Sequence, residues 1–473
     1  MRRPVSSPVA VVAAVVAAAC TLAACAERPT EPARTRAPGA ASASVASGGV
    51  MTSAENAVAT AAIVRQLAAS RGIVPLRRPA PVRPALVALG RALLFDPILS
   101  GNRDIACATC HLPGFSTGDG RSLSIGQGGS GFGPSRLHPA GTLIPRNAPP
   151  MFALGAMKHL FWDGRVQLGP DGRVQTPAGA QVTAEMQRTF EFGPISALGM
   201  FPVTSRAEMR AGRENEVGMV ADTDLRGIWA ALMRRLGAIP QYRAMFEAAY
   251  PGTRFDQMTF AHASNAIGGF IVDKLTFTNT PWDRFLAGDD RALTTAQLDG
   301  AQTFLSLKCS VCHDGATFSD DQFHNVAVAQ IGPGEGNGDG GRDDFGRMNV
   351  TGLAADRYRF RTTPLRNVEL TAPYGHDGAV TSLRAFVAHY SQSDLKLQSF
   401  DGASLDAGLR GSLLATASRI LATRDTLLNG VVFGDDVVNK LMAYMSALTD
   451  DAARNLSSLT PERVPSGLRV PRP

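Results

Sequence analysis

Two five-residue stretches decide the fold of this chain: Cys107-Ala-Thr-Cys110-His111 and Cys309-Ser-Val-Cys312-His313. Each has the order Cys-x-x-Cys-His, in which two thiols attach a haem through its vinyl groups and the adjacent imidazole binds the iron. A redox dithiol or half of a zinc site also uses a Cys-x-x-Cys pair, but neither explains a histidine directly after both pairs. The sequence therefore predicts two covalently bound haem c groups, with His111 and His313 as iron ligands.

Length and composition bound the architecture around these motifs. The chain has 473 residues, 44% of them apolar, which is enough for two or three domains with buried cores. The motifs lie roughly 200 residues apart, a spacing that suits one haem per domain. Leucines recur at helical spacing before the first motif, and the alternation typical of strands is rare. We expect a mainly α protein with two cytochrome c-like haem domains in tandem, residues 84–258 and 259–473.

The first 83 residues carry signs of export. Arg2 and Arg3 precede an apolar run too short to span a membrane, and the run ends in Leu22-Ala-Ala-Cys25. This order resembles a bacterial lipoprotein cleavage site, so we expect residues 1–25 to be a signal peptide with a lipobox; ordinary signal cleavage is the alternative. Residues 26–83 form a tether and N-terminal extension, with a helix over 54–69. The expected location is periplasmic, with a lipid anchor in a membrane.

The charge and one glycine-rich stretch each exclude a class of function. The net charge of +6 comes without a basic cluster that has interleaved aromatic residues, so no nucleic-acid partner is expected. The glycine-rich stretch IGPGEGNGDGGRDD, residues 331–344, lacks the ligand order of an EF-hand and is expected to be a flexible surface loop.

Further landmarks occur in a fixed order along the chain. They are LGRALLFDPILSGNRDIACATCH at 89–111, RNAPPMF at 146–152, FWDGR at 161–165, FPVTSRAEM at 201–209, the second Cys-x-x-Cys-His, and PLRNVELTAPYGHDG at 364–378. Together they resemble the bacterial di-haem cytochrome c peroxidases and their MauG-type relatives, over about residues 84–450.

The resemblance implies separate roles for the two haems. The haem on His111 would be the peroxidatic one, and the haem on His313 the site of electron entry. Trp162 matches the tryptophan that bridges the haems; interdomain packing is the alternative role. Glu208 matches the distal carboxylate that moves a proton during peroxide cleavage, whereas a helix-start charge behind Ser205 is the alternative.

The chain departs from the family on the first haem's distal side. Reductively activated peroxidases place a blocking histidine about sixteen residues beyond the first haem histidine, where this chain has Gln127. Glutamine is a poor haem ligand, so we expect an iron that is open in the resting ferric state. His138, later in the loop, is the rival ligand. The family's glutamine shortly before a Gly-Pro pair is replaced by Phe190.

A second departure concerns the distal ligand of the C-terminal haem. Where the peroxidases have a methionine, this chain has Tyr390, as in MauG-type proteins. An anionic phenolate favours ferric or higher oxidation states, whereas a thioether favours ferrous iron. His389 is a rival ligand, and a core tyrosine is the third possibility. The remaining candidates are expected to be structural: Met442 and Met445 in the core, and His324 and His376 bonded to haem propionates or backbone.

The resemblance also implies one calcium ion between the domains. Asn147 matches the family's side-chain ligand, and Thr371 and Pro373 match its two backbone-carbonyl ligands. Oxygen ligands of this kind suit Ca²⁺. A turn before a proline is the alternative role for Asn147.

These features predict a di-haem c-type peroxidase that reduces hydrogen peroxide to water. Its electrons would come from a small periplasmic redox protein, a cytochrome c or a cupredoxin. The first alternative is a MauG-type oxidase that acts on a protein or organic substrate through high-valent haem, using Tyr390 and Trp162. The second is a non-catalytic di-haem electron-transfer cytochrome.

Overall fold

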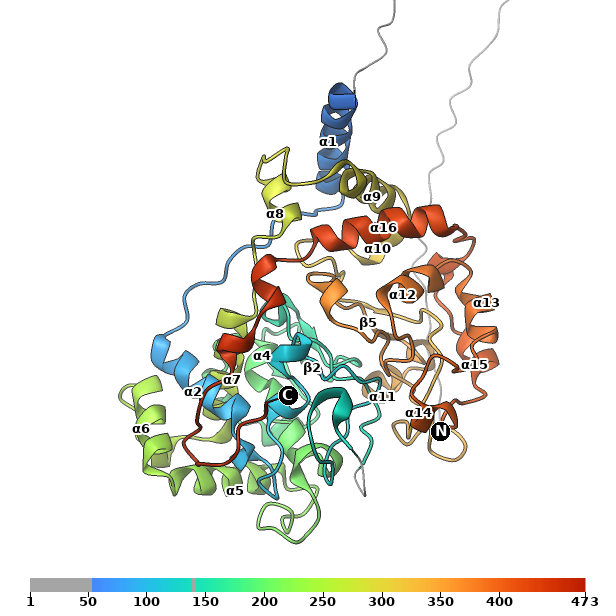
Figure 1. The fold of residues 1–473 in the computed structure, drawn as a ribbon. Coiled ribbons are helices and arrows are strands. Elements are labelled where there is room, and N and C mark those ends of the chain that lie inside the picture. Colours follow the sequence, from blue (N-terminus) through green and yellow to red (C-terminus); the bar gives the residue numbers. More distant parts are fainter. Residues whose placement is uncertain (1–52, 138–141, 473) are drawn as a thin grey trace, which may run out of the picture. The chain divides into compact units, whose positions relative to one another are not determined.

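The computed structural model of the chain describes residues 53–137 and 142–472, and this part is predominantly helical (Figure 1). The signal peptide with Cys25, residues 26–52 of the tether and the rival ligand His138 lie outside the described residues. The α-helices are α1 Ser53–Ser70, α2 Pro84–Phe95, α3 Ala184–Thr189, α4 Pro194–Leu198, α5 Leu225–Gly237, α6 Pro240–Ala249, α7 Phe260–Lys274, α8 Pro281–Leu286, α9 Thr295–Ser306, α10 Cys309–Cys312, α11 Met348–Thr351, α12 Leu383–His389, α13 Ser393–Gln398, α14 Ala407–Arg410, α15 Ala417–Leu421 and α16 Asp435–Ala447. The strands are β1 His159–Leu160, β2 Val166–Leu168, β3 Val174–Gln175, β4 Phe323–His324 and β5 Phe360–Arg361.

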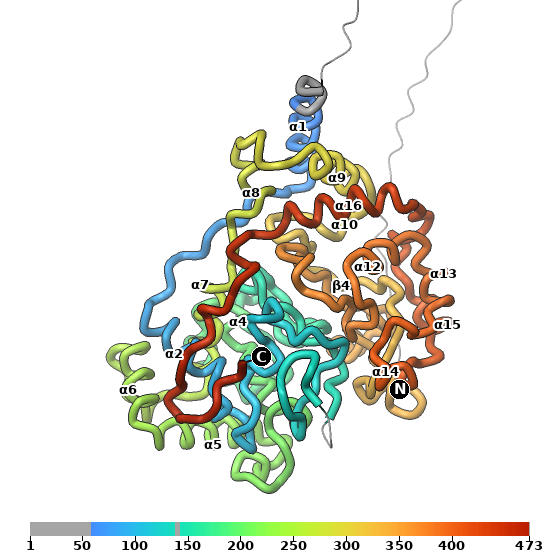
Figure 2. The backbone as a smooth tube through the Cα atoms, in the orientation of Figure 1, coloured from blue at the N-terminus to red at the C-terminus, as the bar shows by residue number. Residues whose placement is uncertain are grey.

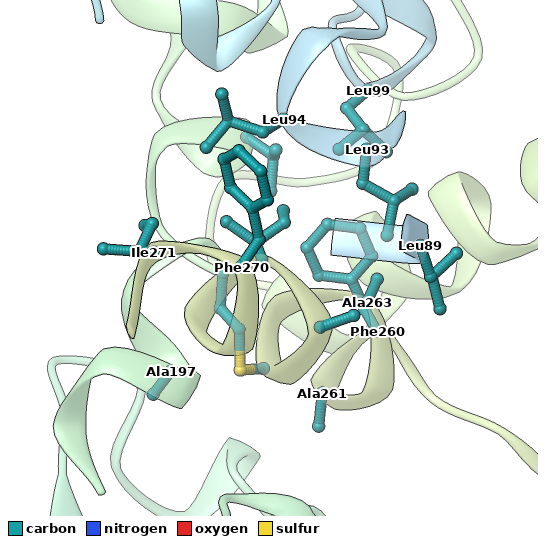
Figure 3. Close-up of a cluster of buried hydrophobic side chains, with 14 of the residues drawn as sticks. Leu89, Leu93, Leu94, Leu99, Ala197, Phe260, Ala261, Ala263, Phe270 and Ile271 are labelled. Atoms are coloured by element: carbon teal, nitrogen blue, oxygen red, sulfur yellow. The ribbon is translucent and has the colours of Figure 1, made fainter. Parts of the chain in front are cut away.

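The first hydrophobic core forms where α2 and α7 cross. Proline at the first turn of α2 suits a helix start, because its missing N–H is not needed there. Leucines of α2 and phenylalanines of α7 meet in the interior (Figure 3). A Cβ atom on Gly90 would lie 1.9 Å from the Ala266 carbonyl oxygen, so only glycine permits this close approach of the two helices.

The second core repeats this plan with α9 and α16. Here Gly300 of α9 faces the backbone of α16, and a Cβ atom on it would lie 2.1 Å from the Lys440 carbonyl oxygen. Four aromatic rings fill the space beside this crossing, at centroid distances of 5.1–6.2 Å between neighbours: Trp282, Phe304, Phe318 and Tyr444. In each core, a helix just before a Cys-x-x-Cys-His motif packs against a helix that follows it much later.

The helix α7 belongs to the first core, whereas the expected boundary after residue 258 places it in the second domain. The first core includes buried residues through Leu275, beyond the boundary expected after residue 258. Periodicity shows that a stretch is a buried helix but not which helix it meets. The predicted helix at 54–69 is confirmed as α1.

Both ends of the described chain cross over to the other half. Ala61, Val64 and Ala68 of α1 are buried in the second core. Residues of the C-terminal tail, among them Leu456 and Val464, are buried in the first core, as the red end of the tube beside α2 shows (Figure 2). The two halves are therefore tied together by both flanking segments.

Two small sheets position the segment at 161–165. Strands β1, β2 and β3 form an antiparallel sheet, and this segment is the turn between β1 and β2. Strands β4 and β5 pair antiparallel in the second half. The backbone N–H of Arg361 in β5 donates to the Trp162 carbonyl oxygen at 2.9 Å, so the turn contacts the second half directly. Within the described residues, no helix has the length and apolar character needed to cross a membrane.

Candidate di-haem active site

The first motif folds as a tight turn that presents its histidine. Cys107–Thr109 is a short 3-10 helix, and the ring atom Nδ1 of His111 lies 2.8 Å from the Thr117 carbonyl oxygen. A carbonyl partner requires Nδ1 to carry the proton, which leaves Nε2 free to bind iron. Burial lowers the pKa of His111, so the ring is held in the neutral form that a metal ligand needs.

The second motif repeats this arrangement. Its two cysteines are the first and last residues of the short helix α10. The ring atom Nδ1 of His313 lies 2.9 Å from the Phe318 carbonyl oxygen. Burial again lowers the pKa of the histidine. Both motifs therefore hold a histidine whose Nε2 is free to bind iron.

A cavity of about 470 Å³ opens beside the second motif. Its size falls in the range of cofactor sites. Cys309, Cys312 and His313 line one side, and Trp162 and Tyr390 are also in its wall. The cavity thus adjoins three of the predicted functional groups and extends toward the turn at 161–165.

Tyr390 and His389, the two rival distal ligands, differ in their surroundings. Tyr390 lines the cavity, and burial together with the nearby cysteines raises the pKa of its phenol. His389 is not in the cavity wall among the described residues; its Nε2 donates to the Val326 carbonyl oxygen at 2.8 Å. A phenolate at Tyr390 needs a nearby cation to offset the cost of burial, and a ferric iron would supply that charge.

Trp162 is held at the edge of the same cavity. Its indole Nε1 donates to the Asn147 carbonyl oxygen at 2.9 Å. The preceding Phe161 has a left-handed backbone, with φ of 63°, which turns the chain sharply at this point. The ring is therefore fixed by its own hydrogen bond as well as by packing.

A buried arginine holds this region to the second half of the molecule. The Arg146 guanidinium contacts Asp163 at 2.6 Å and both oxygens of Asp344, at 2.7 and 2.9 Å. A weaker contact of 3.4 Å reaches Glu335. Burial alone would raise the pKa of Asp163, but the charges of Arg165 and Arg146 lower it to about 2.

Residues 331–344 were expected to form a flexible surface loop. Much of the segment is exposed, as expected for a surface loop, but this network anchors it at Glu335 and Asp344. Asp343 and Asp344 are buried, and Tyr358 donates to the Asp343 carboxylate at 2.8 Å. The many glycines permit the backbone turns that carry Glu335 and Asp344 to Arg146. The sequence offered no signal for this, because the partner lies almost 200 positions earlier.

Glu208 lies in a single turn of π-helix, Arg206–Arg210, which Ser205 caps by accepting from the Glu208 backbone N–H at 3.3 Å. Such turns are frequent at functional sites. Burial raises the pKa of the thiols of Cys107 and Cys110 to about 12, and the negative charge of Glu208 adds to the rise at both. Glu208 is therefore near the first haem attachment site.

Charged neighbours act on Glu208 in opposite directions. Burial raises the pKa of its carboxyl group, Arg165 opposes this rise, and Glu335 adds to it. Arg165 also stacks 3.8 Å above the Phe161 ring, so its charge is held in place. Neither Arg165 nor Glu335 was singled out from the sequence as a neighbour of this group.

Gln127 is fixed beside the same turn. Its side-chain amide donates to the Met209 carbonyl oxygen at 3.0 Å and to Asp104 at 3.2 Å. Its backbone N–H donates to the Ala207 carbonyl oxygen at 2.9 Å. The side chain expected in place of a blocking histidine is thus engaged with the protein.

The three predicted calcium ligands meet at a second, much smaller cavity. Asn147, Thr371 and Pro373 all line a space of about 10 Å³. The Asn147 amide nitrogen donates to the carbonyl oxygens of Arg121 and Ser122 at 2.9 and 3.2 Å. Its amide oxygen therefore remains as the acceptor for a cation.

The other imidazoles and the methionines have structural partners. His324 was expected to bond a propionate or backbone; instead its ring nitrogens contact the carboxylates of Asp425 and Asp320 at 2.6 and 2.9 Å. The sulfur of Cys312 lies within 4.8 Å of His324 and Asp320, and we expect that sulfur to be bonded to haem. His376 stacks on Phe360 at 3.7 Å. Met445 is buried in the second core and Met442 packs against it, as expected.

Comparisons with known proteins agree on one family. The profile of the di-haem cytochrome c peroxidase family matches residues 84–291. Cytochrome c551 peroxidase of Pseudomonas aeruginosa is 30% identical over 311 residues, which are 66% of this chain and 72% of that protein. Methylamine utilization protein MauG of Methylorubrum extorquens is 28% identical over 318 residues, 67% and 71% of the two chains.

A solved structure supports the same fold. The crystal structure of a MauG-like protein associated with microbial copper homeostasis superimposes with a TM-score of 0.56 at 25% identity. The likeness covers 82% of this chain and 97% of that one. The predicted mainly α fold with tandem cytochrome c-like domains is thereby confirmed.

Proposed function

Since the chain belongs to the di-haem cytochrome c peroxidase family, we propose that it reduces hydrogen peroxide to water with electrons from a small cytochrome c or cupredoxin. Membership makes it an oxidoreductase with two haem c groups. The observation that carries the proposal is the position of Glu208, a carboxylate with a raised pKa near Cys107 and Cys110. A haem attached there would have a proton-transferring group beside it.

The first half of the reaction is proton transfer at Glu208. When bound through His111, the haem supplies the iron that passes electrons to peroxide; two protons and two electrons convert one peroxide molecule into two water molecules. The Glu208 carboxylate accepts a proton from one peroxide oxygen and returns it to the other, which becomes the leaving group. Arg165 favours the ionised carboxylate, the form that can accept the proton.

Electrons reach this site through Trp162 in our proposal. The indole lines the cavity at the second motif, and its N–H bond to the Asn147 carbonyl oxygen keeps the ring in one orientation. Arg146 holds the adjacent Asp163, and so stabilises the turn that carries the ring. A fixed indole is what an electron relay between two bound haems would require.

We also propose one Ca²⁺ at the small cavity, held by the Asn147 side chain and the carbonyl oxygens of Thr371 and Pro373. Support comes from the meeting of these three residues at one space. Because Asn147 also accepts the Trp162 bond, an ion here would stabilise the segment that orients the relay.

A MauG-type oxidase is the second candidate function. Tyr390 in the cavity wall favours it, since a phenolate ligand lowers the potential of the second haem. Gln127, fixed by hydrogen bonds where a blocking histidine would stand, favours it too. The substrate would then be a protein or an organic molecule. Nothing favours the third hypothesis, a non-catalytic cytochrome, in a family of oxidoreductases.

Location is proposed from the N-terminal sequence alone. The apolar run and Cys25 support export to the periplasm and lipid attachment to a membrane.

Optical and EPR spectra of the ferric holoprotein, before and after peroxide, test the proposal. We expect one high-spin and one low-spin haem that react with peroxide without prior reduction. Tyr390→Met should change the low-spin signal and raise the potential of that haem, within the range of roughly 0.8 V that axial ligands span. His389→Gln is the matched control and should leave both unchanged, because His389 bonds to backbone.

The outcomes separate the candidates. Two low-spin haems that react only after one-electron reduction would contradict the open-iron reading of Gln127. Rapid turnover with a reduced cytochrome c would support the peroxidase, whereas slow donor turnover with oxidation of an added protein would support the oxidase.

A further inference from the structure

A buried carboxylate without a counterpart lies in the wall of the small cavity. Asp119 lines this cavity together with Asn147, Thr371 and Pro373. Asp119 is 2% exposed, and its Oδ1 accepts from the Arg121 backbone N–H at 3.1 Å. Its Oδ2 has no hydrogen-bond partner among the described residues.

No ion pair joins Asp119 to a basic side chain among the described residues, although the charge of Arg121 lowers its pKa. Arg121 directs its guanidinium to the carbonyl oxygens of Leu123, Pro134 and Arg136. The nearby Ser124 hydroxyl lowers the pKa of Asp119, yet no hydrogen bond of standard geometry joins the two side chains. Burial is the largest influence and raises the pKa. Proteins normally pair a buried charge or bind it to a metal.

The cavity has the size and the donors for one small cation. A space of about 10 Å³ admits about one water-sized sphere. The donors implied by the family resemblance, an amide oxygen and two carbonyl oxygens, are all neutral. A site with no charged ligand binds Ca²⁺ weakly, because affinity rises with the number of carboxylates.

We propose that Asp119 is the charged ligand of this cation site, with Oδ2 facing the ion directly or through one water. The inference rests on the proposed calcium site and adds a residue to it. Asp119 follows the first haem motif by only a few residues, whereas Thr371 and Pro373 belong to the second half. An ion bound to all of them would join the first motif's own turn to the second half.

Calcium titration of the holoprotein tests the proposal. Protein freed of calcium by a chelator is titrated with CaCl₂ in a calorimeter, and bound calcium is measured by elemental analysis. Asp119→Asn keeps the size of the side chain and removes its charge. We expect at least about tenfold weaker calcium binding in this variant.

Asp96→Asn is the matched control, because Asp96 is equally buried but is bonded to Tyr242 and Ser466 in the first core. It should bind calcium within about twofold of the wild type, within ordinary scatter for an independent site. If Asp119→Asn is not recovered folded, Asp119→Ser removes the charge and leaves room for water.

Three results would overturn the inference. Equal affinity in Asp119→Asn and wild type excludes Asp119 as a ligand and leaves the calcium site standing. An equal loss in Asp96→Asn shows that general destabilisation caused the effect. A wild-type holoprotein that takes up no calcium overturns both this inference and the proposed calcium site.

Discussion

The two haem-attachment regions are alike on the histidine side and different around it. His111 and His313 each direct Nδ1 to a backbone carbonyl, at 2.8 and 2.9 Å, and the carbonyls belong to residues with left-handed backbones, Thr117 and Phe318. The helix before each motif also crosses a later helix at a glycine. What the halves share is therefore the machinery that holds a haem.

The differences lie in the segments added to that common scaffold. Near the first motif, a π-helical turn brings Glu208, and a loop from the second half brings Glu335 close by. Beside the second motif, the cavity wall holds Tyr390 and no glutamate among the described residues. In our proposal, the first site is equipped for proton transfer and the second for holding an oxidised iron. Function in a duplicated fold comes from what is inserted between the repeated elements.

Removing Glu208 should abolish the difference between the two haem sites, and we expect the largest effect, on peroxide turnover. Glu208→Gln keeps the shape but cannot move a proton, so we expect peroxide turnover to fall by about 10²–10⁴-fold. The wild-type rate should also fall as pH drops through the raised pKa of Glu208, because the protonated group cannot accept a proton. Stopped-flow assays across pH measure both.

Glu185→Gln on the exposed first turn of α3 is the control and should keep the wild-type rate and pH profile. A Glu208→Gln enzyme with normal turnover would remove the proposed difference between the two haem sites.

Breaking the Arg146 network should weaken the contact between the turn at 161–165 and the second half, and lower the free energy of unfolding. Arg146→Gln leaves Asp344 buried without its partner and Asp163 with Arg165 alone, a loss of about 3–5 kcal/mol in the free energy of unfolding. Both carboxyl groups have lowered pKa values, that of Asp163 about 2. The stability that these two ionised carboxylates give the folded protein is therefore fully present above the ordinary carboxyl pKa of about 4. It is lost as the pH falls toward 2. Denaturant unfolding at several pH values measures this.

Arg366→Gln provides the comparison, since Arg366 makes a similar buried pair with Asp283 within the second half, at 2.7 and 2.9 Å. We expect a similar loss of stability but no change in electron transfer from the second haem to the first. Equal slowing of transfer in both variants would mean that Arg146 does not hold Trp162.

Replacing Trp162 tests whether it links the two haem sites, and we expect the smallest effect of the three changes. Trp162→Phe removes the indole and its N–H bond, and we expect electron transfer between the haems to slow by at least about tenfold, or about 1.4 kcal/mol in the barrier. Flash-reduction kinetics on the holoprotein follow this step.

Trp229→Phe is the matched control, because Trp229 donates to the Met200 carbonyl oxygen at 2.8 Å in the same way but lies in the first core. Slowing by the control alone would show that packing, not the relay, sets the rate.

The haem chemistry was predictable because each attachment motif consists of contiguous residues. The two Cys-x-x-Cys-His motifs and the helical spacing predicted a mainly α di-haem protein, and the fold and the family agree. Asn147, Thr371 and Pro373 were expected to meet, and they line one cavity. Local order is enough for the haem motifs and the helices, since covalent attachment and helix periodicity depend on neighbours in the chain. The meeting of Asn147 with Thr371 and Pro373 was expected from the family resemblance instead.

What only the tertiary structure decided concerns partners distant in sequence. Apolar periodicity could not show that α7 packs with α2, nor that the loop at 331–344 reaches Arg146. Distant segments also decide that Tyr390 lines the cavity while His389 bonds to a backbone carbonyl. They likewise leave one oxygen of Asp119 without a hydrogen-bond partner among the described residues. The sequence by itself determined the two haem-attachment motifs and the helical fold class, and it supplied the candidates for proton transfer. The packing of distant segments decided their neighbours, because burial and electrostatic effects depend on distance in space and not on separation along the chain.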